Sequence, residues 1–205
     1  MYRGLFITFE GADGCGKTTQ LNMLAEYLTE KGFDVVVTRE PGAKGLGEKL
    51  REILLNYEGV VSDRCEAFLF LADRAQHVDV IVKPAVALGK IVLCDRHTDS
   101  TVAYQGYGRG QDIDRINLLN NIATDGMKPD LTFVFDIDVE TSQQRVGSEK
   151  DRMESAGMDF HNRVRQGYLK LAENEPNRIK VIDAKKSIPN IHDEVVEIIE
   201  SFLSA

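Results

Sequence analysis

One segment of the chain combines residue types and a spacing that bind phosphate: Gly11-Ala12-Asp13-Gly14-Cys15-Gly16-Lys17-Thr18. It matches G-x-x-x-x-G-K-[ST], in which the glycines let backbone N–H groups point at phosphate oxygens. The lysine of such a loop reaches the β- and γ-phosphates, and the hydroxyl ligates Mg²⁺. We therefore expect residues 11–18, the phosphate loop, to bind a nucleoside triphosphate, with Lys17 on its phosphates and Thr18 on the metal.

The flanks of the phosphate loop fit this interpretation. Residues 5–9 (LFITF) form a short apolar run typical of a buried strand. Residues 19–31 place Leu21, Leu24 and Leu28 on one face of a helix. A strand, a glycine-rich loop and a helix in this order are the context that the motif requires, since the helix N-terminus adds partial positive charge.

The rest of the chain alternates between strand-like and helical patterns. We predict further strands at residues 34–38, 90–94, 131–135 and 178–182, and helices at residues 46–55, 63–88, 114–124, 140–145, 155–173 and 191–203. Continuous β-branched runs indicate strands buried on both faces, and β/α alternation predicts right-handed crossovers. The prediction is an α/β fold of the P-loop NTPase class: one domain (1–205), three α/β/α layers and a central five-stranded parallel sheet.

Two segments depart from this alternation. Residues 99–111 mix aromatic, amide and hydroxyl groups with three glycines, which predicts a loop that could hold a small polar ligand or could be an ordinary glycine-rich loop. Residues 146–157 are nearly free of apolar side chains and dense in charge, so we expect a mobile lid there.

Composition limits the classes of partner. The net charge of −8 over 205 residues argues against a general nucleic-acid or anionic-membrane binder. We expect no transmembrane helix and no secretory signal. The three cysteines form no metal pattern, which favours a reducing, cytoplasmic location.

Charged residues follow the predicted strands, and the carboxyl ends of parallel strands meet at one edge of the sheet. Arg39 ends the segment before Glu40-Pro41-Gly42, and Arg96 lies between Asp95 and His97. Because guanidinium groups bind phosphate bidentately, two arginines beside the phosphate loop indicate a second phosphorylated ligand. The alternative is that Arg39 and Arg96 simply pair with Glu40 and Asp95.

An ordered set of motifs over essentially the whole chain resembles the thymidylate kinase family. The matching pieces are Phe9-Glu10-Gly11, Thr38-Arg39-Glu40-Pro41-Gly42, Phe70 with Arg74, Asp95-Arg96-His97, Ala103-Tyr104-Gln105-Gly106, Lys128-Pro129-Asp130-Leu131 and Asp151-Arg152-Met153-Glu154. The resemblance implies transfer of the ATP γ-phosphoryl group to dTMP with Mg²⁺, by a cytoplasmic homodimer. It also implies a cis peptide bond before Pro41.

The resemblance assigns roles on the acceptor side. Asp13 would hold the 3′-hydroxyl of the deoxyribose, and Arg39 and Arg96 would bind the acceptor phosphate. Phe70 would stack on thymine, with Arg74 hydrogen-bonding its O4. The remaining acceptor residues implied are Tyr104 beside the sugar 2′ position, and Thr101 and Gln105 along the base and sugar.

On the donor side, the resemblance implies that ATP contacts Gly11, Ala12, Asp13, Gly14, Cys15, Gly16, Lys17, Thr18, Arg145, Ala184 and Lys185. Asp95 would join Thr18 in ordering the metal and its water. Because Gly14 has no side chain to supply charge, the resemblance points to the branch whose lid arginine, here Arg152, completes the transition state. The catalytic set would be Lys17, Arg96, Arg152 and Asp13.

Several interpretations stay open at this stage. Another small nucleotide or deoxynucleoside kinase of the same fold would share these motifs. A nucleotide-dependent switch is disfavoured, because no Asn-Lys-x-Asp guanine signature occurs in the chain. Phe70 could be a core residue, and His97 is assigned no chemistry. The position of Cys15 near a helix N-terminus and Lys17 would lower its thiol pKa, whereas burial would raise it.

Overall fold

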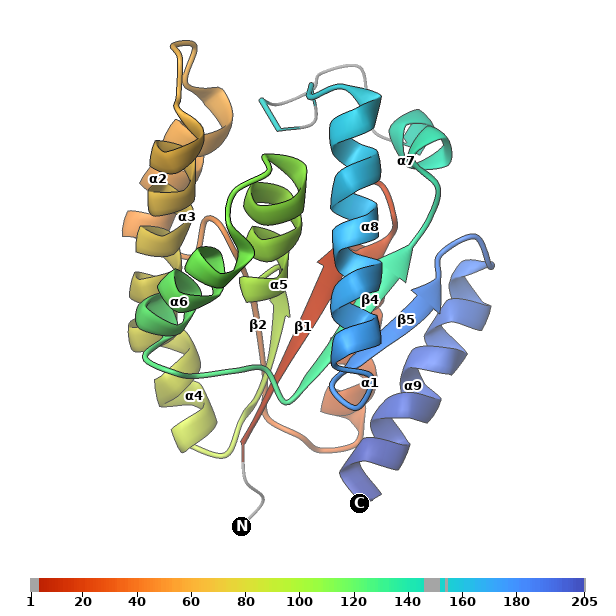
Figure 1. Ribbon diagram of the computed structural model, residues 1–205. Helices are drawn as coiled ribbons and strands as arrows, with labels where there is room; N and C mark the ends of the chain where they lie inside the picture. Colours follow the sequence, from red (N-terminus) through yellow and green to blue (C-terminus); the bar gives the residue numbers. More distant parts are fainter. Residues whose placement is uncertain (1–3, 146–151, 154, 205) are drawn as a thin grey trace.

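The predicted parallel sheet is confirmed. The computed structural model describes residues 4–145, 152–153 and 155–204. Its strands are β1 (Leu5–Gly11), β2 (Val35–Arg39), β3 (Ile91–Asp95), β4 (Leu131–Asp136) and β5 (Ile179–Asp183). They form one sheet in the order β2-β3-β1-β4-β5, and every neighbouring pair is parallel. All strands point the same way, so their carboxyl ends form one edge (Figure 1).

Helices cover both faces of the sheet and complete the three layers. Helices α1 (Lys17–Glu30) and α9 (Ile188–Ser204) pack together on one face, and α8 (Met158–Asn174) crosses the other face in front of β4 (Figure 1). The remaining helices are α2 (Leu46–Asn56), α3 (Asp63–His77), α4 (Lys83–Ala87), α5 (Thr98–Thr101), α6 (Ile113–Thr124) and α7 (Val139–Arg145). No helix in the described part is long and apolar enough to cross a membrane.

The helix predicted at 63–88 is interrupted. The π-helical segment η1 (Val78–Val82) separates α3 from α4. Val78 and Val82 are fully buried, so the wider turn keeps both side chains in the core. Because the apolar spacing of η1 is close to that of an α-helix, the sequence pattern could not distinguish the two.

The core lies between the sheet and α1. Phe9, Phe133 and Phe135 are buried side by side, with the Phe9 ring centroid 5.4 Å and 5.9 Å from the other two. The helical face predicted from Leu21, Leu24 and Leu28 packs on them, and each of these leucines is at most 1% exposed. Burial of a leucine contributes about 1.5–3 kcal/mol, so this packing fixes where α1 begins and where the phosphate loop lies.

The prediction of a loop at residues 99–111 was wrong. This segment forms α5 and a second π-helical segment, η2 (Val102–Gly108). Two of its glycines serve close packing: a Cβ on Gly106 would lie 2.5 Å from Ile113 Cδ1 of α6, and one on Gly108 would lie 2.7 Å from Phe160 Cε2 of α8. Glycine at these two positions therefore marks a tightly packed helix, which the sequence alone does not distinguish from a turn.

The predicted lid is described only in part. Residues 146–151 and 154 lie outside the described residues, and Arg152, Met153 and residues 155–157 lie within them.

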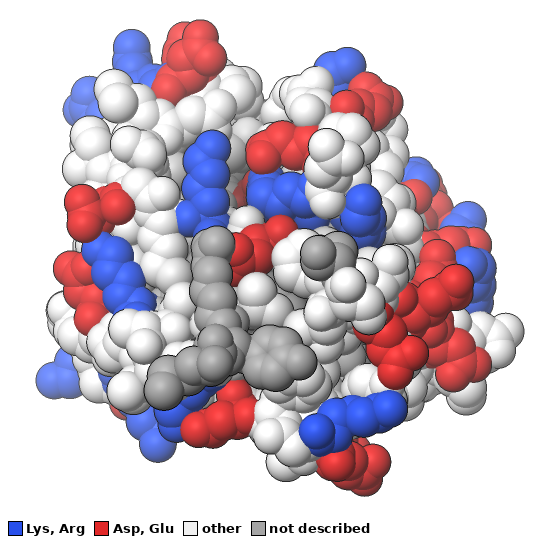
Figure 2. All heavy atoms as spheres, turned by 90° about the horizontal axis from the view of Figure 1, so that it is seen from below, with Lys and Arg blue, Asp and Glu red and all other residues white. Residues whose placement is uncertain are grey.

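The face opposite the carboxyl edge of the sheet shows Lys and Arg interspersed with Asp and Glu (Figure 2). No continuous basic area is visible on that face among the described residues.

The contact at Gly108 leads to a stability prediction. Gly108→Ala should lower the free energy of unfolding by about 1–3 kcal/mol, because the new methyl overpacks the η2–α8 contact. Gly157→Ala is the matched control, since nothing lies within 4 Å of its Cβ position and its φ is −64°. Urea unfolding measures both variants. Equal stabilities of the two would contradict the packing account.

Candidate active site

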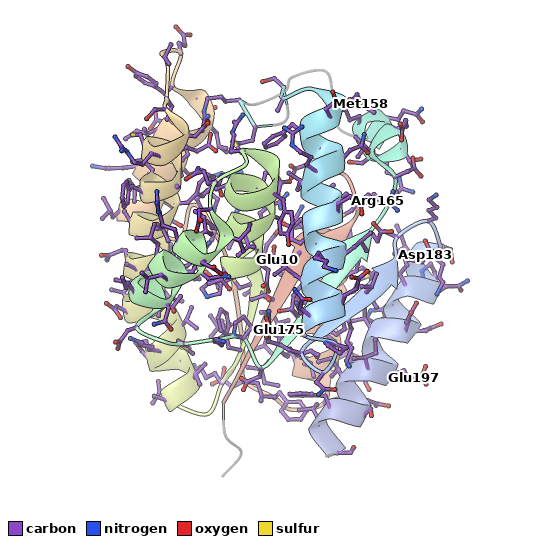
Figure 3. All side chains as sticks on the ribbon, in the orientation of Figure 1. Glu10, Met158, Arg165, Glu175, Asp183 and Glu197 are labelled. Atoms are coloured by element: carbon purple, nitrogen blue, oxygen red, sulfur yellow. The ribbon has the colours of Figure 1, made fainter. Side chains whose placement is uncertain are left out.

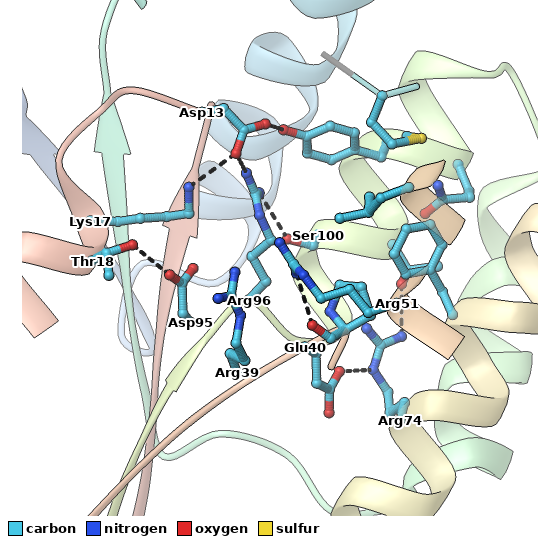
Figure 4. Close-up of a pocket in the computed structure, with 17 residues that line it drawn as sticks. Asp13, Lys17, Thr18, Arg39, Glu40, Arg51, Arg74, Asp95, Arg96 and Ser100 are labelled. Atoms are coloured by element: carbon cyan, nitrogen blue, oxygen red, sulfur yellow. Dashed lines mark hydrogen bonds and ion pairs between the residues drawn. The ribbon is translucent and has the colours of Figure 1, made fainter. Parts of the chain in front are cut away.

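A cavity of about 140 Å³ opens at the carboxyl edge of the sheet. Its lining is drawn in Figure 4 and consists of Asp13, Lys17, Thr18, Arg39, Glu40, Pro41, Arg51, Leu55, Phe70, Arg74, Asp95, Arg96, Ser100, Thr101, Tyr104, Gln105 and Met153. The structure therefore brings together all eight of the predicted acceptor residues.

The phosphate loop forms one end of the cavity. Gly16 precedes α1 with a φ of +89°, a conformation that favours glycine. Lys17 is buried, and its Nζ lies 3.3 Å from Ala12 O and 3.5 Å from Asp13 Oδ1. Exposed backbone N–H groups of the first helical turn and the Lys17 ammonium thus provide a site for a phosphate chain.

Thr18 and Asp95 place two oxygen ligands beside Lys17. Thr18 Oγ1 donates a hydrogen bond to Asp95 Oδ2 at 2.7 Å (Figure 4). In the described residues no cluster of three or more His, Cys, Asp or Glu side chains could hold a metal by itself. One hydroxyl and one carboxylate fit Mg²⁺, which keeps several waters and takes further oxygens from substrate phosphates.

The guanidinium of Arg96 lies at the centre of the cavity, between the phosphate loop and the acceptor residues (Figure 4). Its Nη2 donates to Asp13 Oδ1 at 2.6 Å, and its Nη1 donates to Gly11 O at 2.9 Å. Although burial opposes ionisation, Arg96 and Lys17 hold the pKa of Asp13 below its usual value. Arg96 has a φ of +70°, a strained conformation for arginine that the surrounding contacts maintain.

Arg74 lies at the opposite end of the cavity and is almost fully buried. Its Nε donates to Glu40 Oε2 at 2.9 Å. The other described hydrogen bonds of its guanidinium go to Thr101 Oγ1, Asn120 Oδ1 and His97 O. These four bonds account for four of the five guanidinium hydrogens and leave one for a ligand.

The alternative pairing of the two arginines is not observed. Glu40 binds Arg74, His77 and His97, and Asp95 binds Thr18. Although burial opposes ionisation, His97 and Arg74 hold the pKa of Glu40 well below its usual value. Arg39 is exposed, lines the cavity and forms no ion pair with any of the described residues. Its guanidinium is therefore available to an anion.

The other acceptor candidates surround these groups. Phe70 is half-buried and lines the cavity, so it is not a pure core residue. Tyr104 OH donates to Asp13 Oδ2 at 3.4 Å, and its ring lies beneath the Arg96 guanidinium at 5.1 Å. Gln105 Nε2 donates to Glu66 Oε1 at 2.9 Å.

Arg152 does not contact the phosphate loop in this conformation. Its Nη1 pairs with Glu66 and its Nε donates to Leu54 O at 3.0 Å, so it is held against α2 and α3. Its neighbours Asp151 and Glu154 lie outside the described residues.

The predicted adenine-side residues lie close to each other, away from the cavity lining. Arg145 Nη1 donates to Ala184 O at 3.3 Å, and Lys185 Nζ pairs with Asp138 at 2.8 Å.

Sequence reasoning missed several lining residues. Arg51 on α2 lines the cavity, and its Nη1 donates to Pro41 O at 2.9 Å. The Glu40–Pro41 peptide bond is cis, as the resemblance implied. No local signal distinguishes Arg51 from a solvent-facing helix residue. Met153 lies within one of the motifs that carry the resemblance and Ser100 lies near another, but their place in the cavity depends on tertiary packing.

Cys15 is not activated. It is 1% exposed within the main core, and burial raises its thiol pKa despite the opposing charge of Lys17. The suggestion of a lowered pKa is therefore wrong, because desolvation of the thiolate outweighs the helix terminus.

Comparison with known proteins agrees with this geometry. The family model described as thymidylate kinase matches residues 9–195. The chain belongs to the thymidylate kinase family. It is 46% identical to the thymidylate kinase of Desulfovibrio desulfuricans over 97% of this chain and 96% of that protein. The thymidylate kinase of Geotalea uraniireducens is 50% identical over 90% and 91% of the two chains.

The fold comparison agrees with the family assignment. A crystal structure of thymidylate kinase from Ehrlichia chaffeensis matches with a TM-score of 0.81 and 40% identity, covering 96% of this chain and 98% of that one. The three-layer arrangement and the phosphate loop are therefore those of a P-loop NTPase fold.

Thiol reactivity checks the environment of Cys15. Cys65 is exposed, whereas Cys15 and Cys94 are buried and free. In the folded protein, one thiol should react rapidly with a chromogenic disulfide, and all three should react after denaturation. Cys65→Ser should abolish the rapid phase. A rapid phase that is lost in Cys15→Ser would contradict the burial account.

Proposed function

We propose that this protein transfers the γ-phosphoryl group of ATP to dTMP, giving dTDP and ADP. The observation that carries the proposal is the Arg96 guanidinium, which Asp13 orients between a complete phosphate loop and the cavity lined by Phe70 and Arg74. A cation at this place would contact the phosphate of a nucleotide whose base extends toward Arg74. Family membership supports the same reaction.

In this proposal the donor phosphates occupy the phosphate loop. Lys17 would contact the β- and γ-phosphates, and Mg²⁺ would be held by Thr18, with Asp95 ordering its water ligands. The metal would neutralise charge on the transferred group. The acceptor phosphate is already ionised, so the site needs no strong general base, and positioning with charge neutralisation supplies the rate.

The acceptor would be recognised at both ends. Arg96 and Arg39 would bind its phosphate, and Asp13 would accept from the 3′-hydroxyl. Phe70 would stack on thymine while the remaining N–H of Arg74 donates to O4. Tyr104 would fill the space that a 2′-hydroxyl requires. The residues proposed along the base and sugar are Thr101 and Gln105.

Arg145, Ala184 and Lys185 would lie around adenine, with Arg145 held on the Ala184 carbonyl and Lys185 paired with Asp138. A homodimer is the assembly that the resemblance suggests. Exposed apolar side chains on α3 and α6, namely Phe68, Leu118 and Ile122, offer a surface for it. The free cysteines favour the reducing environment of the cytoplasm.

A panel of acceptors tests the proposed activity. With ATP and Mg²⁺, dTMP should be the best acceptor in a coupled assay of ADP release. dUMP should be weaker by about 10–200-fold in kcat/KM, because a missing methyl costs about 1–3 kcal/mol in a pocket. UMP, CMP and AMP should be poor. Turnover of thymidine instead of dTMP would identify a nucleoside kinase, and no turnover of any acceptor would favour a binding protein.

Arg152 is proposed to reach the transferred phosphoryl group only after it leaves Glu66 and Leu54. Arg152→Ala should therefore lower kcat by about 10³-fold, with little change in ATP affinity, because the contact exists only in the transition state. Arg145→Ala is the matched comparison and should weaken ATP binding instead. Steady-state kinetics with direct ATP titration measures both. A near-normal kcat for Arg152→Ala would assign the role to another cation.

A further inference from the structure

Glu10 is a buried carboxylate that the proposed reaction does not use. It lies on β1 in the interior, between α5 and α8 (Figure 3), and is 0% exposed. Its Oε2 accepts hydrogen bonds from Ser100 Oγ at 2.5 Å and from Tyr168 OH at 3.1 Å. Its Oε1 accepts from the backbone N–H of His97 at 2.7 Å. A charge held in the core without a described ion pair of its own requires a reason.

The two hydroxyls that bind Glu10 also contact Arg96. One hydrogen of Arg96 Nη1 goes to Gly11 O, and the other is shared between Tyr168 OH at 3.2 Å and Ser100 Oγ at 3.4 Å. The hydroxyls lie 2.8 Å from each other. A guanidinium only donates, and each hydroxyl has a single hydrogen. Both oxygens can therefore face Arg96 as acceptors only if their hydrogens are directed along the chain that ends on Glu10.

We propose that Glu10 is a positioning residue for Arg96: its carboxylate turns the hydroxyls of Ser100 and Tyr168 so that their oxygens accept from the guanidinium. This inference rests on the proposed role of Arg96 in binding the acceptor phosphate. Protonated Glu10 would donate a hydrogen into the same chain. One hydroxyl hydrogen would then point toward Arg96, and the guanidinium would lose an acceptor.

The burial of Glu10 makes this change of protonation state accessible near neutral pH. Burial, followed by the charge of Asp99 on α5, raises the pKa of Glu10 to about 7, against the opposing effect of Arg96. Asp99 itself is paired with Arg178 at 2.7 Å. Tyr168 from α8 and the His97 N–H following β3 complete the surroundings.

The raised pKa has a consequence for stability with a definite sign. The folded state binds the proton of Glu10 more tightly than the unfolded state, so stability falls as pH rises from about 4.5 to about 7. The carboxylate is thus unfavourable for folding above pH 7. Ionisation of Glu10 should therefore lower stability and at the same time strengthen dTMP binding. A residue with a purely structural role would not show these two opposite effects.

Glu10→Gln is the direct test, since the amide keeps the shape and cannot become a carboxylate. At pH 8 its Kd for dTMP should be about tenfold higher than that of the wild type, the size expected for a lost hydrogen bond to a charged group. At pH 5.5 the two Kd values should converge. The dTMP phosphate also titrates near pH 6, but both proteins experience this equally. The Kd for ATP should stay unchanged, and the Tm of the variant relative to wild type should increase with pH.

Two further variants distinguish loss of this hydrogen-bond chain from general damage to the fold. Tyr168→Phe removes one hydroxyl and should weaken dTMP binding at pH 8, with an effect that is not additive with that of Glu10→Gln. Thr8→Val alters a buried hydroxyl on the same strand, one that bonds to Thr132, and should leave dTMP binding unchanged. Equal Kd values for Glu10→Gln and wild type at pH 8, or the same ratio at both pH values, would overturn the inference. Absence of dTMP binding by the wild type would instead refute the proposed function.

Discussion

The ion pair between Arg96 and Asp13 is the interaction on which the site depends. A largely buried guanidinium must be compensated by charge and by hydrogen-bond acceptors. The sheet supplies them by placing β1 beside β3, with Phe9 opposite Asp95. The segments that follow these strands therefore meet, and Asp13 comes within 2.6 Å of Arg96. The phosphate loop and the central cation are fixed by the same strand pairing.

Each of the two largely buried arginines pairs with its own carboxylate, and the two ion pairs lie in different parts of the cavity. Arg96 pairs with Asp13 near the phosphate loop, and Arg74 pairs with Glu40 at the far end. Both guanidiniums are oriented by hydrogen bonds within the protein, so little reorganisation is needed when a nucleotide binds. Arg39, in contrast, is exposed. A site that is rigid at its centre and open at one side can admit an anion and then hold it in line with the phosphate loop.

The local sequence pattern was sufficient to predict the sheet and the phosphate loop, because buried parallel strands and glycine-rich loops have strong sequence signatures. It failed at residues 99–111, where Gly106 and Gly108 are close-packing residues of a helix instead of turn residues. It left the thiol pKa of Cys15 open, because the burial of that side chain depends on the core around α1. Which carboxylate pairs with which arginine could not be predicted either. Asp13 and Arg96 are 83 positions apart, and the adjacent Glu40 and Asp95 remained alternative partners for the arginines.

The most direct test of the central claim compares dTMP with thymidine, which lacks the phosphate, in wild type and in Arg96→Ala by isothermal titration. If Arg96 binds the acceptor phosphate, wild type should prefer dTMP strongly, and the variant should lose most of that preference while binding thymidine as before. Arg96→Lys should recover only part of it, because an ammonium is a point charge without the guanidinium fork. An unchanged preference for dTMP in Arg96→Ala would contradict the account.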